Sequence, residues 1–442
     1  MATPALTPTL RQNLRERLAS ARGQTDSLFA LIRPAAIHDR PIPERHRMIF
    51  YLGHLEAFDW NLMATGALRL ESFDPALDKL FSFGIDPVDG NLPSDQLSDW
   101  PSVGQVNKYN ARVREKLDAE LKEALEGNGT KSELADGTLL HVAIEHRLMH
   151  AETLAYLLHE MSFDRKFARP ETHQIATSLY RSRTVPIPEG SATLGQRRSG
   201  GEFGWDNEFE EFRVRVPSFR IDAFPVSNAK FLEFVQAGGY EDPVLWRADD
   251  WDWKTKAGLS YPHFWVRRGA EWFWRGMFEE IPLRPAWPVY VSHAEASAFA
   301  RWAGKSLPTE AQWHRAAYGT PDGPERSYPW GNDPPAAQHG NFDFRLWDPT
   351  PINAYPAGTS AFGVYDLLGN GWEWTRTPFR SLPGFKAFPF YPGYSANFFD
   401  EKHFVMKGGS SRTAACLMRR SFRNWFQPHY SYVFSKFRCV EE

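Results

Sequence analysis

The chain has 442 residues, with 51 basic and 54 acidic side chains, a length that accommodates two or three domains of about 150 residues each. A net charge of −3 lacks the clustered basic surplus that nucleic acids and anionic membranes attract, so we expect neither as a partner. Two cysteines cannot build a disulfide framework, no apolar run is long enough to span a membrane and no secretory signal opens the chain, so we expect a cytoplasmic protein.

Residues 1–165 are predicted to be helical, because apolar side chains recur there at helical spacing. The four runs with this pattern are 10–32, 44–70, 106–125 and 139–161, and segments rich in Pro, Gly, Asp and Ser separate them. Four long helices with intervening loops favour an up-down four-helix bundle. Residues 166–183 are the expected linker to the rest of the chain.

Residues 184–442 have a different composition. All but two of the 17 Trp lie after residue 200, and Gly and Pro interrupt the chain every few residues. The helices predicted here are short and cover 228–236, 293–303 and 310–318. We therefore expect an irregular, loop-rich α+β domain after the helical one.

A pair of histidines is the sharpest chemical pattern of the predicted bundle. His146 and His150 are four residues apart, so a helix places both imidazoles on one face. That face is otherwise apolar, and His54 lies on a similar apolar face of the second predicted helix. Buried imidazoles carry a free-energy cost unless something satisfies them. A three-histidine metal site, suited to zinc or to non-haem Fe(II), is one interpretation, and separate structural histidines are the other.

The second half carries a series of short motifs. In chain order they are GWDNE (204–208), SLPTEAQW (306–313), YPWG (328–331), DLLGNGWEWT (366–375), KGGS (407–410) and FSKFRC (434–439). This series resembles the formylglycine-generating/sulfatase-modifying domain, which has a C-type-lectin-like fold. The first half resembles the DinB-like four-helix bundle, whose metal motif is a His on one helix and His-x-x-x-His-x-Glu on another. The combination resembles the ergothioneine-type sulfoxide synthases over nearly the whole chain.

This resemblance implies a fold and a reaction. A DinB-like bundle at 1–165 would carry the metal, and a C-type-lectin-like domain at 184–442 would form the substrate pocket. The implied metal ion is Fe(II), with His54, His146 and His150 as its ligands. The family is made up of oxidoreductases that use O2 to join a cysteine-type sulfur to C2 of the imidazole of hercynine, which is trimethylhistidine. Three imidazole ligands leave positions on the metal where the reacting groups can meet.

The resemblance also implies residues that hold the substrate. Asn424 would bind the carboxylate of hercynine, and Trp425 would face its quaternary ammonium, which aromatic rings bind well. Phe426 stands where the family often has Asp, so a direct charge partner is missing there, although an aromatic ring can still serve a cation. A family tyrosine donates a proton during sulfoxidation, and Tyr391 and Tyr394 are the nearest candidates. Core packing is the alternative role for the tryptophans.

The chalcogen donor is suggested by the stretch 80–107, which contains no Lys or Arg but has Asp86, Asp89, Asp95 and Asp99. Family members that use cysteine or γ-glutamylcysteine need cations for the carboxylates of the donor. Carboxylates suit a neutral polyol instead, and this loop resembles the selenoneine synthase branch, which takes selenium from a selenosugar. We therefore expect C–Se bond formation, with Asp86 and Asp89 facing the sugar. A solvated acidic loop explains the same charges equally well.

Other functions remain open alternatives. The first is C–S bond formation on hercynine, with arginines such as Arg419 or Arg420 holding the sulfur donor. A zinc-dependent thiol transferase would use the same three histidines without O2, and a non-catalytic lectin-like binding protein would not need them. Cys416 and Cys439 are 23 positions apart, which argues against the paired thiolates of a formylglycine generator. The sequence leaves the oligomeric state open.

Overall fold

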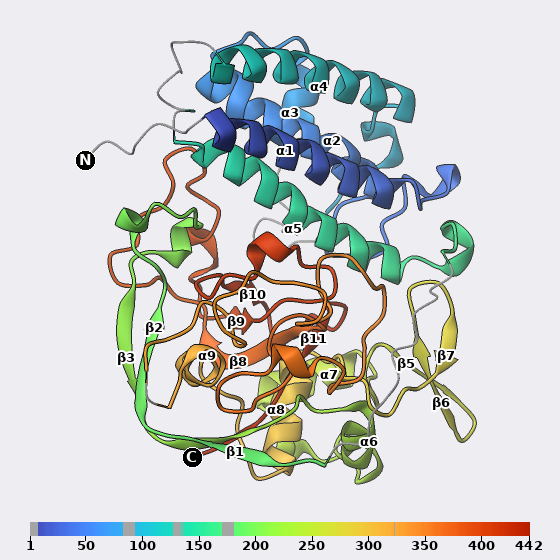
Figure 1. Ribbon diagram of the computed structural model, residues 1–442. Coiled ribbons are helices and arrows are strands. Elements are labelled where there is room, and N and C mark those ends of the chain that lie inside the picture. The colour runs from blue at the N-terminus through green and yellow to red at the C-terminus, as the bar shows by residue number, and fades with distance from the viewer. Residues whose placement is uncertain (1–7, 83–92, 127–133, 135, 170–180, 322) are drawn as a thin grey trace. The chain divides into compact units, whose positions relative to one another are not determined.

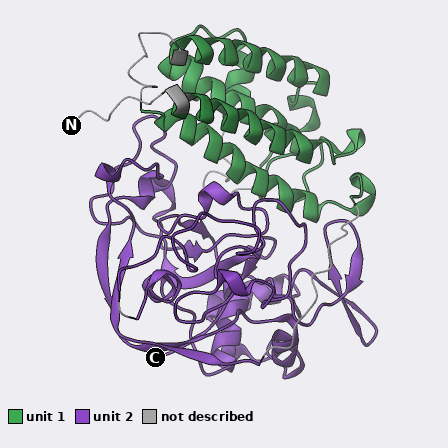
Figure 2. Cartoon of the chain, in the orientation of Figure 1, with its two compact units in different colours: residues 1–169 green, residues 170–442 purple. Residues whose placement is uncertain are grey.

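The computed structural model of the chain describes residues 8–82, 93–126, 134, 136–169, 181–321 and 323–442. The chain divides into two units, Met1–Arg169 and Pro170–Glu442, which Figure 2 shows in green and purple. Unit 1 is helical, and unit 2 combines short helices and short strands with long irregular segments (Figure 1). The expected α+β class is therefore confirmed.

Helices form the described part of unit 1. They are α1 (Pro8–Phe29), α2 (Met48–Asp59), α3 (Pro75–Leu80), α4 (Val103–Glu126) and α5 (Thr138–Glu160). Helix α1 packs against α5, and α2 packs against both α4 and α5. At its end α2 continues as a π-helix over Trp60–Ala67, a widened form that often lies near functional sites. Nowhere in the described part of the chain is a helix both long enough and apolar enough to cross a lipid bilayer.

The start of α2 and the end of α5, the two helices that carry the candidate histidines, each have an identifiable cause. Helix α2 starts later than the predicted run 44–70, because Arg47 has extended backbone angles with φ −66° and ψ 156°. Helix α5 ends at Glu160, and the buried Lys166 ammonium donates to the carbonyl oxygens of Leu158 and Met161, the latter at 3.0 Å. A cation at a helix C-terminus satisfies carbonyls that have no helical partner and opposes the negative end of the helix dipole.

Unit 2 contains several small sheets instead of one large one. Its strands are β1 (Thr184–Ile187), β2 (Gly190–Leu194), β3 (Phe212–Val216), β4 (Phe219–Asp222), β5 (Trp265–Arg268), β6 (Glu271–Arg275), β7 (Glu280–Pro282), β8 (Trp372–Pro378), β9 (Phe404–Lys407), β10 (Asn424–Phe426), β11 (Ser435–Lys436) and β12 (Val440–Glu441). The sheet orders are β1-β4-β12, β10-β9-β8-β11, β2-β3 and β5-β6-β7. Strand β10, which carries the predicted substrate residues, is therefore the outermost strand of its sheet.

Four short helices accompany these sheets in the described part of unit 2. They are α6 (Asn228–Gln236), α7 (Ala248–Lys256), α8 (His293–Trp302) and α9 (Glu310–Tyr318). The predictions of α6, α8 and α9 are confirmed. Helices α8 and α9 begin with capping boxes, in which Ser292 pairs with Glu295 and Thr309 with Gln312. Helix α7 escaped prediction because its sequence, ADDWDWKTK, has little apolar periodicity.

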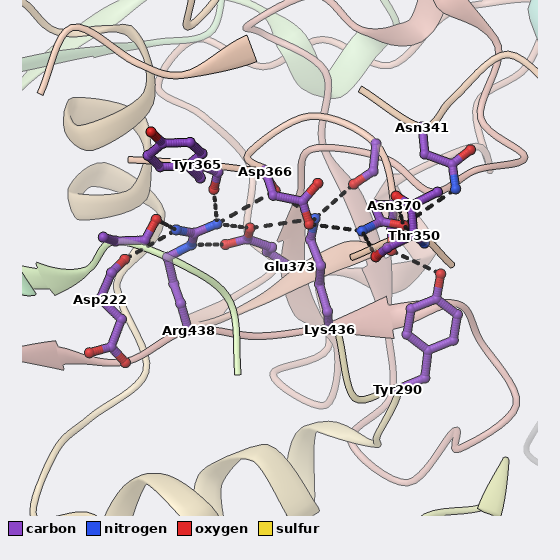
Figure 3. A network of polar contacts seen from close by, with 12 residues as sticks. Asp222, Tyr290, Asn341, Thr350, Tyr365, Asp366, Asn370, Glu373, Lys436 and Arg438 are labelled. Carbon is purple, nitrogen blue, oxygen red and sulfur yellow. Dashed lines mark hydrogen bonds and ion pairs between the residues drawn. The ribbon is translucent and has the colours of Figure 1, made fainter. Parts of the chain in front are cut away.

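A buried polar network joins two of the family motifs in unit 2 (Figure 3). Arg438 donates to both carboxylate oxygens of Glu373, at 2.7 and 2.6 Å. The Lys436 ammonium lies 2.9 Å from Asp366, which also accepts a hydrogen bond from Asn370 at 3.0 Å. These side chains hold β11 parallel to β8, with Lys436 opposite Glu373. The motifs 366–375 and 434–439 therefore have a structural role, because their side chains hold two strands of one sheet together.

Candidate functional site

The three candidate ligands meet inside unit 1. His54 comes from α2, and His146 and His150 come from successive turns of α5. One ring nitrogen of each lies within 4.8 Å of the others, and the exposed fractions of the residues are 4%, 4% and 1%. The ring centroid of His54 lies 5.3 Å from that of His146 and 4.9 Å from that of His150. The structure thus brings together the three histidines that the sequence singled out.

The ring of His54 is held in one orientation and one tautomer. Its Nδ1 lies 2.7 Å from the carbonyl oxygen of Phe81, and because a carbonyl only accepts, Nδ1 must carry the hydrogen. The lone pair is then on Nε2. Phe50 stacks on this ring at 4.8 Å between centroids, and Phe58 stacks on His146 at 3.5 Å. Hydrogen bonds of this kind commonly orient histidines that bind metals.

The chemistry of His150 fits a metal ion. Both of its ring nitrogens are buried, and neither has a hydrogen-bond partner among the residues that the structure describes. A buried polar atom without a partner costs free energy, which coordination of an ion would offset. A set of three imidazole nitrogens suits Zn²⁺ or Fe²⁺.

Burial also keeps these imidazoles neutral. It lowers the pKa of His54 to about 4, against a smaller opposing effect of the hydrogen bond to Phe81. Burial lowers the pKa of His146 and His150 well below the ordinary value, and the neighbouring histidines lower both further. All three rings are therefore uncharged at neutral pH, which is the form that binds metals.

Arg147, next to His146 on α5, forms hydrogen bonds to residues of α2, the helix that carries His54. Its guanidinium donates to Glu56 at 3.0 Å, to Asp59 at 2.7 Å and to the carbonyl oxygen of Leu55 at 2.8 Å. Burial opposes ionisation of Glu56, but Arg147 and then Arg114 lower its pKa to about 2. This cluster was missed in the sequence, because no spacing rule links residues of α2 to a residue about 90 positions later.

The acidic stretch 80–107 is only partly described. Asp86 and Asp89, the residues expected to face a sugar, lie outside the described residues. Asp95 is bound by two arginines from the segment before α2, with Arg47 Nε at 2.8 Å and Arg40 also in contact. Burial opposes ionisation of Asp95, but hydrogen bonds from Trp100 and Arg47 lower its pKa. The stretch 80–107 contains no arginine, but two arginines from another segment lie beside its Asp95 in the folded chain.

In unit 2 the structure brings Trp425, Tyr394 and Tyr391 into one aromatic cluster. Trp425 stacks on Phe379 at 4.1 Å between centroids, with an interplanar angle of 8°, and its centroid lies 5.5 Å from that of Tyr394. Tyr391 and Tyr394 are 5.6 Å apart, and Trp205 stacks on Tyr394 at 3.9 Å. The sequence did not indicate that Trp205 belongs to this cluster, although it is the second residue of the motif at 204–208.

The other two predicted substrate residues point elsewhere. Side chains alternate along a strand, so Asn424 and Phe426 project from the face of β10 opposite to Trp425. Phe426 contacts Tyr430 at 6.0 Å between centroids and does not share the partners of Trp425. The side-chain Oδ1 of Asn424 accepts the backbone N–H of Trp425 at 2.8 Å, so the side-chain NH₂ group is the part suited to a carboxylate.

The strand β10 is anchored by charged residues that precede it. Arg423 is buried, binds both carboxylate oxygens of Glu310 at 2.9 and 3.1 Å, and lies over the ring of Phe379. Arg419 pairs with Glu208 and Arg420 pairs with Glu325 at 3.0 Å. Arg419 and Arg420, named above as a clamp for a sulfur donor, therefore already have carboxylate partners.

Comparison with known proteins places the chain in a family. A family described as the sulfatase-modifying factor enzyme 1-like domain matches residues 171–442. A hercynine oxygenase from Mycolicibacterium smegmatis is 33% identical over 444 residues, covering 97% of this chain and 99% of that protein. The chain belongs to the ergothioneine-type sulfoxide synthase family. It is therefore an enzyme of an oxidative family, as the resemblance implied.

Two further relatives agree with this assignment. A hercynine oxygenase from Mycolicibacterium thermoresistibile is 31% identical, covering 97% of this chain and 95% of that protein. The ergothioneine biosynthesis protein 1 of Neurospora crassa is 26% identical, and the match covers 91% of this chain but only 55% of that longer protein. The similarity to the family thus includes both units of the chain.

Proposed function

We propose that this enzyme joins a chalcogen atom to C2 of the hercynine imidazole in an Fe(II)- and O2-dependent reaction. The observation that carries the proposal is the cluster of three buried histidines, found in a chain whose relatives are called hercynine oxygenases. His54, His146 and His150 would hold the iron, which would supply a redox centre for reaction with O2. Arg147 and the carbonyl of Phe81 keep the three rings in place.

Hercynine would be held by residues of unit 2. Trp425 and Tyr394 offer aromatic faces to the trimethylammonium group, which cannot donate a hydrogen bond. The NH₂ group of Asn424 would donate to the carboxylate. Strand β10 is the outermost of its sheet in the described part of the chain, so one of its edges pairs with no strand there. Tyr391 and Tyr394 are the proposed proton donors. Burial and then the charge of Asp206 raise the pKa of Tyr391 to about 12, so its phenol stays protonated at neutral pH.

The proposed donor is a selenosugar, which gives selenoneine biosynthesis as the role of the enzyme. This part of the proposal rests on the sequence of the stretch 80–107, with its carboxylates and its lack of Lys and Arg. A neutral polyol can donate hydrogen bonds to such carboxylates, whereas an anionic peptide would be repelled.

A second candidate is C–S bond formation with cysteine or γ-glutamylcysteine. One observation favours it, because Arg40 and Arg47 place two guanidinium groups beside the acidic stretch. Both arginines contact Asp95, and a donor carboxylate would have to share or replace that partner. Arginine forks suit carboxylates well, so this exchange is chemically reasonable.

The test is a direct assay with both donors. Protein reconstituted anaerobically with Fe(II) is given hercynine, O2 and either a selenosugar or γ-glutamylcysteine, and products are identified by mass spectrometry. We expect the selenium adduct as the main product. A sulfur adduct alone would establish the second candidate, and no adduct with either donor would refute the proposed function. His141→Ala is the control variant, because His141 lies outside the three-histidine cluster.

A further inference from the structure

The motif 204–208 carries a buried carboxylate, Asp206, close to the two candidate tyrosines. Asp206 lies in a short 3₁₀ turn and is completely buried. Its Oδ1 accepts a hydrogen bond from the hydroxyl of Ser395, and its carboxylate also accepts the backbone N–H of Phe388. Phe388 and Ser395 are the two ends of the segment that carries Tyr391 and Tyr394. One carboxylate therefore fixes both ends of the tyrosine segment.

The residue before Asp206 supports the middle of the same segment. Trp205 is fully buried and stacks on Tyr394, with 3.9 Å between ring centroids and an interplanar angle of 24°. It also lies 6.4 Å from the ring of Phe388. Trp205 and Asp206 thus contact the segment 388–395 at its two ends and at one of its tyrosines.

The turn that carries Asp206 is itself anchored. Glu208 accepts the backbone N–H of Trp205 at 2.8 Å and closes the turn. The same carboxylate is bound by Arg419 at 2.8 Å and by the hydroxyl of Ser421 at 2.7 Å. Both partners lie on the segment that leads into β10. The motif 204–208 therefore connects the tyrosine segment to the strand that carries Trp425.

Asp206 also contributes charge. Its second oxygen, Oδ2, is buried and has no hydrogen-bond partner among the residues that the structure describes. Burial raises the pKa of Asp206, and hydrogen bonds from Ser395, Asn207 and Phe388 oppose that effect. A carboxylate away from water acts strongly on its neighbours, and Tyr391 is a neighbour whose ionisation it disfavours. Arg198 is the cation whose charge acts on Asp206.

We infer that Asp206 is a positioning residue that holds the segment 388–395 in place, and that its charge further disfavours ionisation of the buried Tyr391 phenol. The catalytic consequence of this inference rests on the proposed function, because it needs a tyrosine that donates a proton. The position of the segment 388–395 and the effect of Asp206 on Tyr391 do not depend on the proposed function. Both can be measured in protein that turns over no substrate.

The first test measures the ionisation of residue 391 directly. A fluorinated tyrosine, whose phenol ionises at lower pH than tyrosine, is placed at position 391 in the full chain and titrated by ¹⁹F NMR. Asp206→Asn keeps the shape of the side chain and removes its charge. We expect the pKa at position 391 to fall by about one unit, a tenfold change in the ionisation constant. An unchanged pKa in the folded variant overturns the electrostatic part.

The second test covers the case in which Asp206→Asn does not fold. Ser395→Ala removes one hydrogen bond to Asp206 and leaves the charge intact. We expect the ¹⁹F signal at position 391 to broaden or divide, because one end of the segment is released. A signal with unchanged position and width overturns the positioning part. Asp249→Asn, an exposed carboxylate on α7, is the matched control and should leave the titration and the line shape unchanged.

The third test separates this inference from the proposed function. With hercynine and a donor that reacts, Asp206→Asn should lower kcat about ten- to hundredfold with little change in the KM for hercynine. A positioned proton donor contributes about 10²- to 10⁴-fold, and releasing the segment that carries it should forfeit part of that contribution. An unchanged kcat, or a rise in KM alone, overturns the catalytic consequence. If the native protein forms no product with any donor, the proposed function fails while the ¹⁹F result still decides the role of Asp206.

Discussion

Arg147 Nη2 lies 2.7 Å from Asp59 Oδ2, and the exposed fractions of the two side chains are only 1% and 0%. The contact joins α5 to α2 one residue after His146 and five residues after His54. Glu56 completes the cluster, so one buried cation faces two buried carboxylates. The ion-pair cluster therefore links the two helices that carry the three histidines.

Replacing this arginine should destabilise unit 1. Arg147→Met leaves Glu56 and Asp59 buried without their main cation, and loss of one partner of a buried pair costs about 3–5 kcal/mol. We expect the opening free energy of α2 and α5, measured by hydrogen exchange with mass spectrometry, to fall by about that amount. Arg165→Met, at a more exposed pair with Asp39, is the control and should have a much smaller effect. Equal effects of the two variants would contradict the structural role given to Arg147.

Removing one histidine should remove the metal. His150→Ala takes away one of three proposed ligands and leaves a partly formed site, so we expect Fe(II) affinity to fall more than about a hundredfold. Metal content after anaerobic reconstitution and desalting measures this. His141→Ala should retain the metal of the native chain. Retention of stoichiometric iron by His150→Ala would show that the cluster is not the binding site.

Trp425 should distinguish a quaternary ammonium from a primary one. Its indole shares a cluster with Tyr394 and Phe379, and a desolvated cation over an aromatic face is stabilised by about 2 kcal/mol. We expect Trp425→Ala to weaken hercynine binding at least tenfold in calorimetry and to leave any binding of histidine nearly unchanged. The same loss for both ligands would mean that Trp425 shapes the site without contacting the trimethylammonium group.

His293 should make unit 2 sensitive to acid. Burial lowers its pKa to about 3, partly opposed by Asp250, so the folded state holds the ring neutral where the unfolded state protonates it. The folded pKa is below the unfolded value, so this contribution to stability is complete above about pH 6.5 and is lost as the pH falls toward 3. The slope is about 1.4 kcal/mol per pH unit below pH 6.

The check is a comparison with His293→Gln, whose side chain cannot become charged. Denaturant midpoints of unit 2 at pH 7 and at pH 5 should differ more in the native chain than in the variant. In the native chain the ring of His293 stacks on Phe404, with 3.8 Å between ring centroids. The variant loses this contact and will therefore also be less stable at both pH values. Only the difference between the two pH values reports the titration, and parallel shifts would contradict it.

The convergence of the histidines could be predicted because it is mostly a local property. His146 and His150 share a helix face by spacing alone, and the apolar residues around them indicated that this face is buried. The partner of His54 Nδ1, the carbonyl of Phe81, could not be predicted, because a backbone oxygen 27 positions away leaves no mark in the sequence. The same holds for Arg147 and its carboxylates on α2.

Charge arguments based on one stretch of sequence were less dependable. Asp95 belongs to a stretch of sequence without Lys or Arg, yet Arg40 and Arg47 approach it from the segment before α2. Asn424, Trp425 and Phe426 were grouped as neighbours in sequence, and strand alternation separates Trp425 from the other two. In both places closeness along the chain differs from closeness in space.

The measurement that tests the central claim most directly follows the C2 proton of hercynine by NMR. The account predicts that this proton signal disappears in step with O2 consumption when Fe(II)-loaded protein, a chalcogen donor and O2 are all present, and that it persists in His146→Ala. Persistence of the C2 proton in the complete reaction would contradict the account. Its loss without matching O2 consumption would also contradict it, because replacing the C2–H bond by a carbon–chalcogen bond releases two electrons that O2 must accept.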